Sequence, residues 1–357
     1  AKAIAIAQKD NKDLEPLKPF SLGIVSNTTT SIIVPALVAT AARYGFLLMV
    51  HEAPYGQAAQ VAIGEVEAFK DLAMDAILIA IDYKGLPGPS NIPSFGKDTD
   101  THKALDHLNM IRSQLKQRYG APCIMQTCAH EPESFFGNFD IQVNNTSRQF
   151  INIFNSGLVS EIVGTDDFLL DVAAIAETVG LANWHDPVMY HMAKLPFAQK
   201  LVPFYAEQVC RIISAMSGKA RRALILDLDN TLWGGVIGDD GLSGIELGQG
   251  NALGEAYLAV QNTVLKLRQR GIVLAVCSKN NDTTARIPFR EHPDMLLNES
   301  HIAVFRANWE DKVPNIQFIA ETLNLGLESI VFFDDNPVER DRVRYELPEV
   351  AVPELPE

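Results

Sequence analysis

The stretch ALILDLDNTLW, residues 223–233, decides how the second half of this chain folds. Its first four residues are apolar and predict a short buried strand that ends at Asp227. Residues i and i+2 of an extended chain face the same way, so Asp227 and Asp229 are expected to project together from the strand end. Two carboxylates at short range raise each other's proton affinity unless a cation lies between them. A hard ion held by oxygen ligands, usually Mg²⁺, meets that need, as in metal-assisted phosphoryl-transfer sites.

Two other apolar runs of this half also end in polar residues. Residues 272–276 are followed by Cys277, Ser278 and Asn280, and residues 330–333 by paired acids. A third run, residues 302–305, precedes the segment NWEDK, which places a lysine at the start of a predicted helix. Ligands of open parallel sheets bind beyond the carboxyl ends of the strands. These polar strand ends therefore predict one shared site.

The alternation of apolar runs and helical stretches predicts the fold class. The N-terminal half alternates predicted strands (residues 22–25, 46–50, 76–81, 123–125) with predicted helices (residues 34–44, 61–73, 102–118). Such alternation is typical of mostly parallel sheets with helices on both faces. The second half repeats the scheme, except that the glycine-rich residues 234–241 predict a tight hairpin instead of a helix. We expect an α/β protein with two open, mostly parallel sheets.

Length and charge limit the classes of function. The 357 residues predict two domains, which we place at residues 1–217 and 218–357 because a helical stretch over residues 203–217 leads into a basic linker. The formal charge of −14 argues against nucleic acid or an anionic membrane as the main partner. A small phosphorylated substrate stays compatible with it, through a metal and local positive groups. The four cysteines lack zinc-ligand spacing and no apolar stretch is long enough to cross a bilayer, so we expect reduced thiols and a cytoplasmic protein.

The ordered motifs of the second half resemble those of the haloacid dehalogenase (HAD) superfamily of aspartate-nucleophile phosphotransferases. The matching positions are the DxDxT run that ends at Thr231, then Ser278, Lys312, and the pair Asp334 and Asp335. The closer resemblance is to the FkbH-like subgroup, through LDLDNTLWGGVIGDDG, VCSKNN, NWEDK and FFDDNPVERDRVR followed by VPELPE. This resemblance covers roughly residues 145–357.

The resemblance implies a role for each matched residue. Asp227 is the nucleophile that forms an aspartyl-phosphate, and Asp229 is the general acid and base. Mg²⁺ is held by the Asp227 carboxylate, by Asp229 through its backbone carbonyl, and by Asp334, with Asp335 close by. Ser278 and Lys312 hold the phosphoryl oxygens. Thr231, Asn280 and Cys277 are assigned to substrate binding.

For several of these residues a purely structural role remains an alternative to the role in chemistry. Taken alone, Ser278 is also explained as a helix cap and Lys312 as a surface lysine, while Asp335 suits either a metal ligand or a residue that holds the loop. Glu339 and Arg340 are expected to form an exposed ion pair on a helix. The two tryptophans near the motifs, Trp233 and Trp309, are expected to pack in the core or in a lid.

The FkbH-like resemblance also implies a substrate. The family is associated with polyketide and related pathways, where it transfers a glyceryl unit from 1,3-bisphosphoglycerate to the thiol of an acyl carrier protein. Cys277, next to Ser278, is either an acyl carrier or a small buried residue that closes a strand. A stand-alone small-molecule phosphatase and a non-catalytic module that docks a carrier protein remain the two alternatives.

The N-terminal half resembles, in general layout, the SGNH-hydrolase-type domain that precedes the HAD core in this family. Its first strand ends in Ser26-Asn27-Thr28, where an SGNH hydrolase has Gly-Asp-Ser. Asp186 and His191 lie five residues apart, and not at the Asp-x-x-His spacing of that class. We therefore expect a domain without esterase activity, in which Asn27, Asp82 and His191 pack or fix loops.

Overall fold

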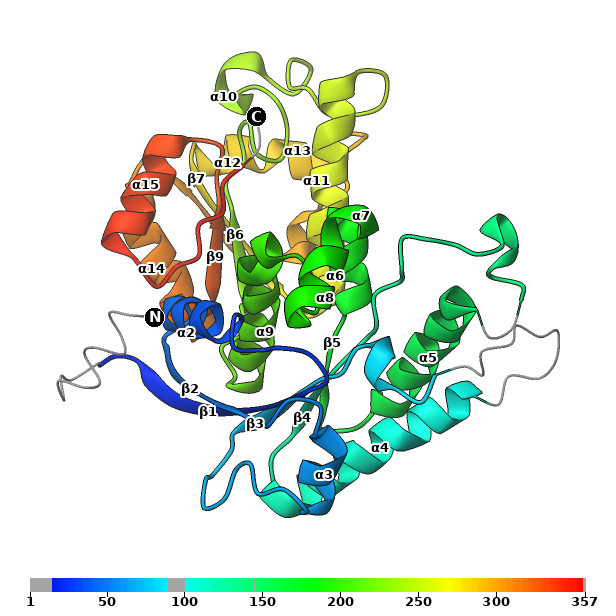
Figure 1. Ribbon diagram of the computed structural model, residues 1–357. Helices are drawn as coiled ribbons and strands as arrows, with labels where there is room; N and C mark the ends of the chain where they lie inside the picture. The colour runs from blue at the N-terminus through cyan, green and yellow to red at the C-terminus, as the bar shows by residue number, and fades with distance from the viewer. Residues whose placement is uncertain (1–14, 89–99, 144–145, 356–357) are drawn as a thin grey trace. The chain divides into compact units, whose positions relative to one another are not determined.

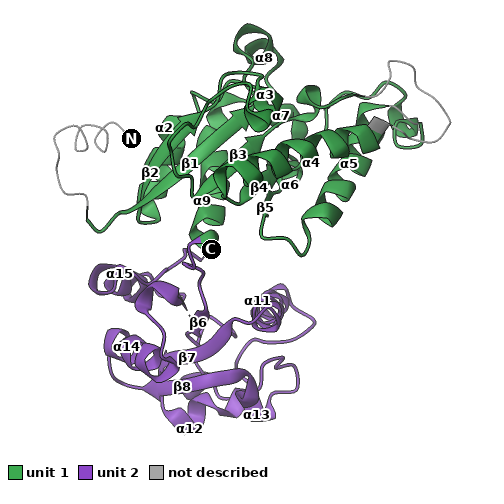
Figure 2. Cartoon of the chain, turned by 90° about the horizontal axis from the view of Figure 1, so that it is seen from below, with its two compact units in different colours: residues 1–216 green, residues 217–357 purple. Residues whose placement is uncertain are grey.

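The computed structural model describes residues 15–88, 100–143 and 146–355. The chain divides into two compact units, Ala1–Met216 (unit 1) and Ser217–Glu357 (unit 2), which are coloured separately in Figure 2. Each unit is built on one parallel sheet with helices on both faces. The predicted α/β fold class is confirmed.

Unit 1 contains a parallel sheet with the strand order β2-β1-β3-β4-β5. Its strands are β1 (Lys18–Ser26), β2 (Phe46–Glu52), β3 (Ala76–Ala80), β4 (Cys123–Gln126) and β5 (Phe168–Leu170). The chain moves outward from β1 to β2 and then returns to the other side of β1 to form β3. This reversal leaves a crevice beyond the carboxyl ends of β1 and β3, the place where open α/β sheets bind ligands.

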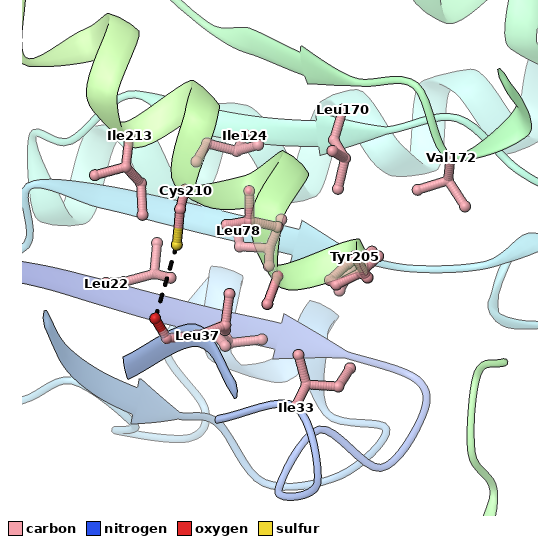
Figure 3. Packing of buried hydrophobic residues seen from close by; sticks show 14 of the residues in the cluster. Leu22, Ile33, Leu37, Leu78, Ile124, Leu170, Val172, Tyr205, Cys210 and Ile213 are labelled. Atoms are coloured by element: carbon pink, nitrogen blue, oxygen red, sulfur yellow. Dashed lines mark hydrogen bonds between the residues drawn. The ribbon is translucent and has the colours of Figure 1, made fainter. Parts of the chain in front are cut away.

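Alternating side chains divide the core of unit 1 into two layers. Leu22 and Leu78 face one layer, and Val25 and Ile79 face the other. The first layer packs against α2 (Val34–Arg43), α6 (Val172–Val179) and α9 (Val202–Met216), as Figure 3 shows for α9. The second packs against α3 (Ala58–Ile63), α4 (Asp100–Tyr119) and α5 (Ser147–Ile162). The shorter elements are α7 (Leu181–Trp184), α8 (Pro187–Ala193), η1 (Tyr83–Gly85), η2 (Gly137–Phe139) and η3 (Gln199–Leu201).

One predicted helix of unit 1 is too long. The prediction covered residues 61–73, but α3 ends at Ile63. Gly64 follows with a left-handed backbone (φ +85°), and its N–H donates to carbonyls of the last turn. Glycine adopts this conformation at no steric cost and ends helices for that reason. The apolar residues after Gly64 therefore pack as turns.

Unit 2 contains a parallel sheet with the strand order β8-β7-β6-β9. Its strands are β6 (Ala223–Leu226), β7 (Val273–Lys279), β8 (Ile302–Asn308) and β9 (Ile330–Phe333). The central strand β6 pairs with both β7 and β9, and Leu226 is in register with Val276 on one side and Phe333 on the other. The order reverses between β6 and β9, so the residues after these two strands meet at a switch point.

The helices of unit 2 cover both faces of its sheet (Figure 1). One face packs against α11 (Ala252–Gln269), α12 (Asp282–Ala285) and α13 (Ile287–Glu291), and the other against α14 (Lys312–Leu323) and α15 (Pro337–Glu346). Single 3₁₀ turns η4 (Glu299–His301) and η5 (Leu327–Ser329) precede β8 and β9. Across the described part of the whole chain, no helix combines the length and apolar character that a membrane crossing requires.

The glycine-rich segment after β6 is only partly a hairpin. Gly234 and Glu246 form an antiparallel bridge in which each backbone N–H donates to the other's carbonyl, at 3.0 and 2.8 Å. Between them the chain makes one helical turn, α10 (Ile237–Asp240), where the prediction had no helix. The Asp240 carboxylate stabilises this turn by accepting from the Val236 N–H at 2.7 Å.

Candidate active site

The strand ends of unit 2 bring three acidic side chains together. Asp227 follows β6, and Asp334 and Asp335 follow the neighbouring strand β9. Each of the three has a carboxylate oxygen within 4.8 Å of an oxygen of the other two. Asp227 and Asp334 are buried and Asp335 is partly buried. Residues about a hundred positions apart thus form one acidic cluster at the switch point of the sheet.

Lys312 lies between two of these carboxylates. Its Nζ is 2.8 Å from Asp227 Oδ1 and also donates to Asp334 Oδ2. Lys312 is the first residue of α14, and only 4% of its surface is exposed. A buried ammonium is stable only when it is paired, and here two carboxylates pair with it. Lys312 is therefore not a surface lysine, and that alternative from the sequence is wrong.

Burial and charge shift the pKa values of the cluster in opposite directions. Burial raises the pKa of Asp227 to about 7; Lys312 counteracts this effect and Asp334 adds to it. Burial lowers the pKa of Lys312, but the attraction of Asp227 and Asp334 exceeds that effect and raises the pKa above its usual value. Burial and the nearby Asp334 raise the pKa of Asp335. The cluster therefore holds more negative charge than Lys312 alone compensates.

Asp229 is held by hydrogen bonds that orient its carboxylate. Oδ1 accepts from the Trp233 indole N–H and from the Ile237 backbone N–H, both at 2.9 Å, and Oδ2 accepts from Asn280 Nδ2 at 2.9 Å. Burial raises the pKa of Asp229 even though these donors lower it. A fixed carboxyl group with a raised pKa has the properties of a general acid. Trp233 packs fully in the core, whereas Trp309 is 76% exposed.

Thr231 links the two halves of the acidic cluster. Its buried hydroxyl accepts from the Asp335 backbone N–H at 3.1 Å and lies 3.4 Å from Asp335 Oδ1. The Asp334 carboxylate in turn accepts from the Asn336 N–H at 2.8 Å. Thr231, which the sequence assigned to substrate binding, therefore holds the loop after β9 against the loop after β6.

Ser278 and Cys277 lie on opposite faces of β7. Ser278 is 2% exposed, and no described residue forms a hydrogen bond with its hydroxyl, which is therefore available to a ligand. Cys277 has no exposed surface and packs against α14 and α15, with its Sγ 3.9 Å from the Lys312 carbonyl. Burial raises the pKa of the Cys277 thiol to about 12. These features favour the packing interpretation of Cys277 over an acyl carrier.

The expectation of an exposed ion pair between Glu339 and Arg340 is wrong. Glu339 Oε1 accepts from Lys279 Nζ at 2.6 Å instead. Arg340 is buried, and its Nη1 donates to the carbonyls of Asp334 at 2.9 Å and Asp335 at 2.6 Å. Sequence analysis missed this role, although an arginine in the first turns of a helix that follows an acidic loop is placed to reach back to it.

The cluster fits a divalent cation. Asp227, Asp334 and Asp335 supply the hard carboxylate oxygens that Mg²⁺ prefers, and the three are close enough to share one ion. With Lys312 counted, three ionised carboxylates leave a formal charge of −2, which such an ion neutralises. Burial, followed by the nearby Asp334, raises the pKa of Asp227, and a cation held by these carboxylates would favour its ionised form.

Comparison with known proteins identifies similar chains. The family model described as FkbH, N-terminal domain, matches residues 21–214. A crystal structure of the N-terminal part of the protein BF1531 from Bacteroides fragilis, described as containing a phosphatase domain complexed with Mg, is 32% identical. That similarity covers 100% of this chain and 94% of the other, with a TM-score of 0.89.

Two further structures are distant. An uncharacterized protein from Corynebacterium glutamicum is 13% identical over 39% of this chain and 87% of its own, with a TM-score of 0.27. The salicylyl-acyltransferase SsfX3 from a tetracycline biosynthetic pathway is 15% identical. The similarity covers 58% of this chain and 56% of the other, with a TM-score of 0.34. A search of curated proteins found no match.

Proposed function

The chain belongs to the FkbH family, and we propose that its unit 2 is a Mg²⁺-dependent phosphatase domain that uses Asp227 as nucleophile. The observation that carries the proposal is the cluster of Asp227, Asp334 and Asp335 around Lys312 at the switch point of the sheet. The solved structure that covers this whole chain is described as a phosphatase domain with Mg, which supports the same activity and cofactor.

The proposed reaction has two displacements. The Asp227 carboxylate attacks phosphorus and forms an aspartyl-phosphate, while the leaving oxygen takes a proton from Asp229. Asp229 then removes a proton from water or another acceptor, which attacks the aspartyl-phosphate and releases the phosphoryl group. The Trp233, Ile237 and Asn280 donors keep the Asp229 carboxylate in one orientation through both steps.

Lys312 and Ser278 stabilise the phosphoryl group. Lys312 presents a fixed positive charge beside Asp227, and Ser278 offers a hydroxyl that forms no hydrogen bond with any described residue. Asp227, Asp334 and Asp335 would hold Mg²⁺, together with the Asp229 backbone carbonyl. When bound, this ion neutralises charge on the phosphoryl oxygens and reduces their repulsion of the nucleophile.

The finer proposal concerns the substrate. Family membership supports an acyl phosphate such as 1,3-bisphosphoglycerate as substrate. In this proposal the thiol of an acyl carrier protein attacks the C1 carbonyl and displaces the C1 phosphate, while Asp227 removes the C3 phosphate, so that a glyceryl thioester and two phosphates result. Unit 1, with the strand order 2-1-3-4-5, is the proposed SGNH-like module. Ser26 and Thr28 hydrogen-bond to each other at 2.9 Å, and Ser26 donates to the Ala80 carbonyl at 2.9 Å, so neither hydroxyl is paired with a histidine as an esterase requires.

A phosphatase assay with Asp227→Asn tests the activity. Asparagine keeps the shape of the side chain and removes the nucleophile, so Mg²⁺-dependent release of phosphate from acetyl phosphate is expected to fall about 10³-fold or more. Asp311→Asn, at an exposed carboxylate paired with Arg342, is the matched control and should keep wild-type activity. Equal activity of the wild type and Asp227→Asn would exclude the mechanism and leave a binding module.

Transfer is separated from hydrolysis by adding a carrier protein. We expect a glyceryl adduct on the carrier thiol, detected by intact mass, when the acyl phosphate, Mg²⁺ and the carrier with its thiol arm are all present. Phosphate release that is unchanged by the carrier, with no adduct, would instead identify a stand-alone phosphatase. Cys277→Ala is expected to behave as the wild type, because Cys277 is buried on the other face of β7.

A further inference from the structure

Unit 1 contains a cavity that the phosphatase chemistry does not use. Its volume is about 390 Å³, and all of its lining residues belong to unit 1. Thr28 after β1, Asp82 after β3, Cys128 after β4 and Val172 after β5 contribute to its wall, so it lies beyond the carboxyl ends of these strands. Its size falls within the range of small-molecule sites, and its position is where open α/β sheets bind ligands.

Aromatic side chains form one wall of this cavity. The rings of Trp184 and Phe197 lie 4.6 Å apart, and those of Phe197 and Tyr205 lie 4.9 Å apart. Ile33 and Val172 extend the apolar surface, and Figure 3 shows them, with Tyr205, toward the arrowhead ends of the strands. A rigid aromatic wall of this kind favours a ligand with a flat or otherwise apolar body.

Gln126 provides one buried hydrogen-bond donor to the cavity. Its Oε1 accepts from the Tyr205 hydroxyl at 2.9 Å, whereas its Nε2 has no hydrogen-bond partner among the described residues. Gln126 is 7% exposed as a residue, and its Nε2 atom keeps some accessible surface. An amide NH₂ in this position is available to a carbonyl oxygen of a ligand.

Two further polar groups of the wall offer hydrogen-bond acceptors. The His185 Nε2 lies 2.7 Å from the His130 carbonyl; because a carbonyl only accepts, Nε2 carries a proton, and the tautomer that this contact selects has its acceptor at Nδ1. Ser26 donates to Ala80, so the Thr28 hydroxyl donates its own proton to Ser26 and offers only lone pairs to the cavity. A ligand that fits these groups carries N–H donors in addition to a carbonyl oxygen.

The charge around the cavity excludes anions. Four carboxylates line it, and the lysine among its lining residues, Lys84, has its Nζ 3.8 Å from the centre of the Tyr190 ring. The carboxylates are Asp82, Glu131, Glu133 and Asp186. A phosphorylated or carboxylated molecule would meet a surplus of negative charge, whereas an uncharged donor would not.

We propose that unit 1 binds, in this cavity, a small uncharged molecule with an apolar body and an amide group. The ligand's carbonyl oxygen accepts from Gln126 Nε2, its N–H groups donate to the acceptors near His185 and Asp82, and its body lies against Trp184 and Phe197. The site is a binding site without hydrolytic chemistry, and it is independent of the phosphatase proposal for unit 2.

An isosteric pair of probes tests the proposal. Benzamide and benzoate have the same shape and differ in charge and N–H donors. Binding to the full chain without Mg²⁺ is measured by ligand-observed NMR, with Asp227→Asn as a control for binding at the acidic cluster. We expect benzamide to bind with a Kd of about 10 mM or tighter, and benzoate at least about tenfold more weakly.

Two variants locate the probe. Gln126→Met removes the amide donor at similar length, and should weaken benzamide about five- to tenfold, the effect of one lost hydrogen bond. Val172→Phe fills the cavity and should abolish benzamide binding, and circular dichroism checks that this variant folds. If Val172→Phe does not fold, the result for Gln126→Met tests the proposal by itself. Absent benzamide binding, equal binding of benzoate, or undiminished binding to Gln126→Met would each overturn the proposal.

Discussion

At the scale of single residues, Lys312 and Asp227 form the centre of the candidate active site. Lys312 contacts both Asp227 and Asp334, so one ammonium faces two buried carboxylates. Removal from water disfavours the charged form of Asp227 more than Lys312 favours it, and the pKa of Asp227 rises to about 7. Without a metal, the site therefore carries negative charge that Lys312 does not fully compensate, and the proposed Mg²⁺ would neutralise it.

This uncompensated charge predicts how the stability of the metal-free protein depends on pH. Asp227 has a raised pKa in the folded state, so between about pH 4 and pH 7 the folded state binds a proton that the unfolded state has lost. The contribution of Asp227 to the free energy of unfolding therefore decreases as the pH rises through this window. Chemical denaturation in EDTA should show it as a difference between the wild type and Asp227→Asn.

The comparison with Asp227→Asn isolates this one carboxyl group. Asparagine does not titrate, so the wild type should lose stability relative to the variant as the pH rises from about 4 to 7. A constant difference over this range would show that Asp227 has an ordinary pKa in the folded protein.

At the scale of elements, α15 controls the loop that carries Asp334 and Asp335. Arg340 lies in the first half of this helix and donates to both backbone carbonyls of that loop, and its Nη2 donates to Glu354 at 3.0 Å. A helix that anchors the backbone of two proposed metal ligands would hold their carboxylates in place without competing for the metal. The position of the loop is thus set by an element that supplies no carboxylate to the cluster.

Substitution of Arg340 should weaken Mg²⁺ binding. Arg340→Met leaves both carbonyls unpaired, so we expect about a 10- to 100-fold loss of Mg²⁺ affinity by calorimetry, with all the carboxylates still present. Arg342→Met, on the same helix but 42% exposed and paired with Asp311 and Glu346, is the control and should bind Mg²⁺ normally. Normal Mg²⁺ affinity of Arg340→Met would restrict Arg340 to a role in folding.

At the scale of the whole molecule, each unit has a parallel sheet with its own switch point. Unit 2 places carboxylates and a lysine there, and unit 1 places an aromatic cavity with amide and imidazole groups. The same topological rule therefore produces two chemically different sites in one chain. The residues described here for each site belong to a single unit.

This division predicts where Mg²⁺ protects the backbone from exchange. A ligand stabilises the cooperative unit to which it binds. In hydrogen-exchange mass spectrometry, Mg²⁺ should slow exchange in the peptides that contain Asp227 and Asp334, while peptides of β1 and β3 should be unchanged. Equal protection in unit 1 would show that the two units unfold together.

The sequence predicted most of what depends on local pattern. Short apolar runs separated by helical stretches predicted the two parallel sheets, because a strand buried on both faces is apolar throughout its length. The prediction was wrong for residues 64–73, where one glycine ends a helix that the apolar spacing would continue. The spacing of apolar residues alone does not show whether a glycine within it continues a helix or ends it with a left-handed backbone.

The sequence alone identified the motif residues and the strands that carry them, since polar residues after successive apolar runs indicate the carboxyl edge of a sheet before any coordinate is known. The order of the strands within each sheet came from the tertiary structure. Only the tertiary structure decided that Arg340 is buried against the acidic loop, that Cys277 faces the core, and that unit 1 has an aromatic cavity. These features depend on which side chains from distant segments meet. Such contacts arise from packing in three dimensions, and no local pattern encodes them.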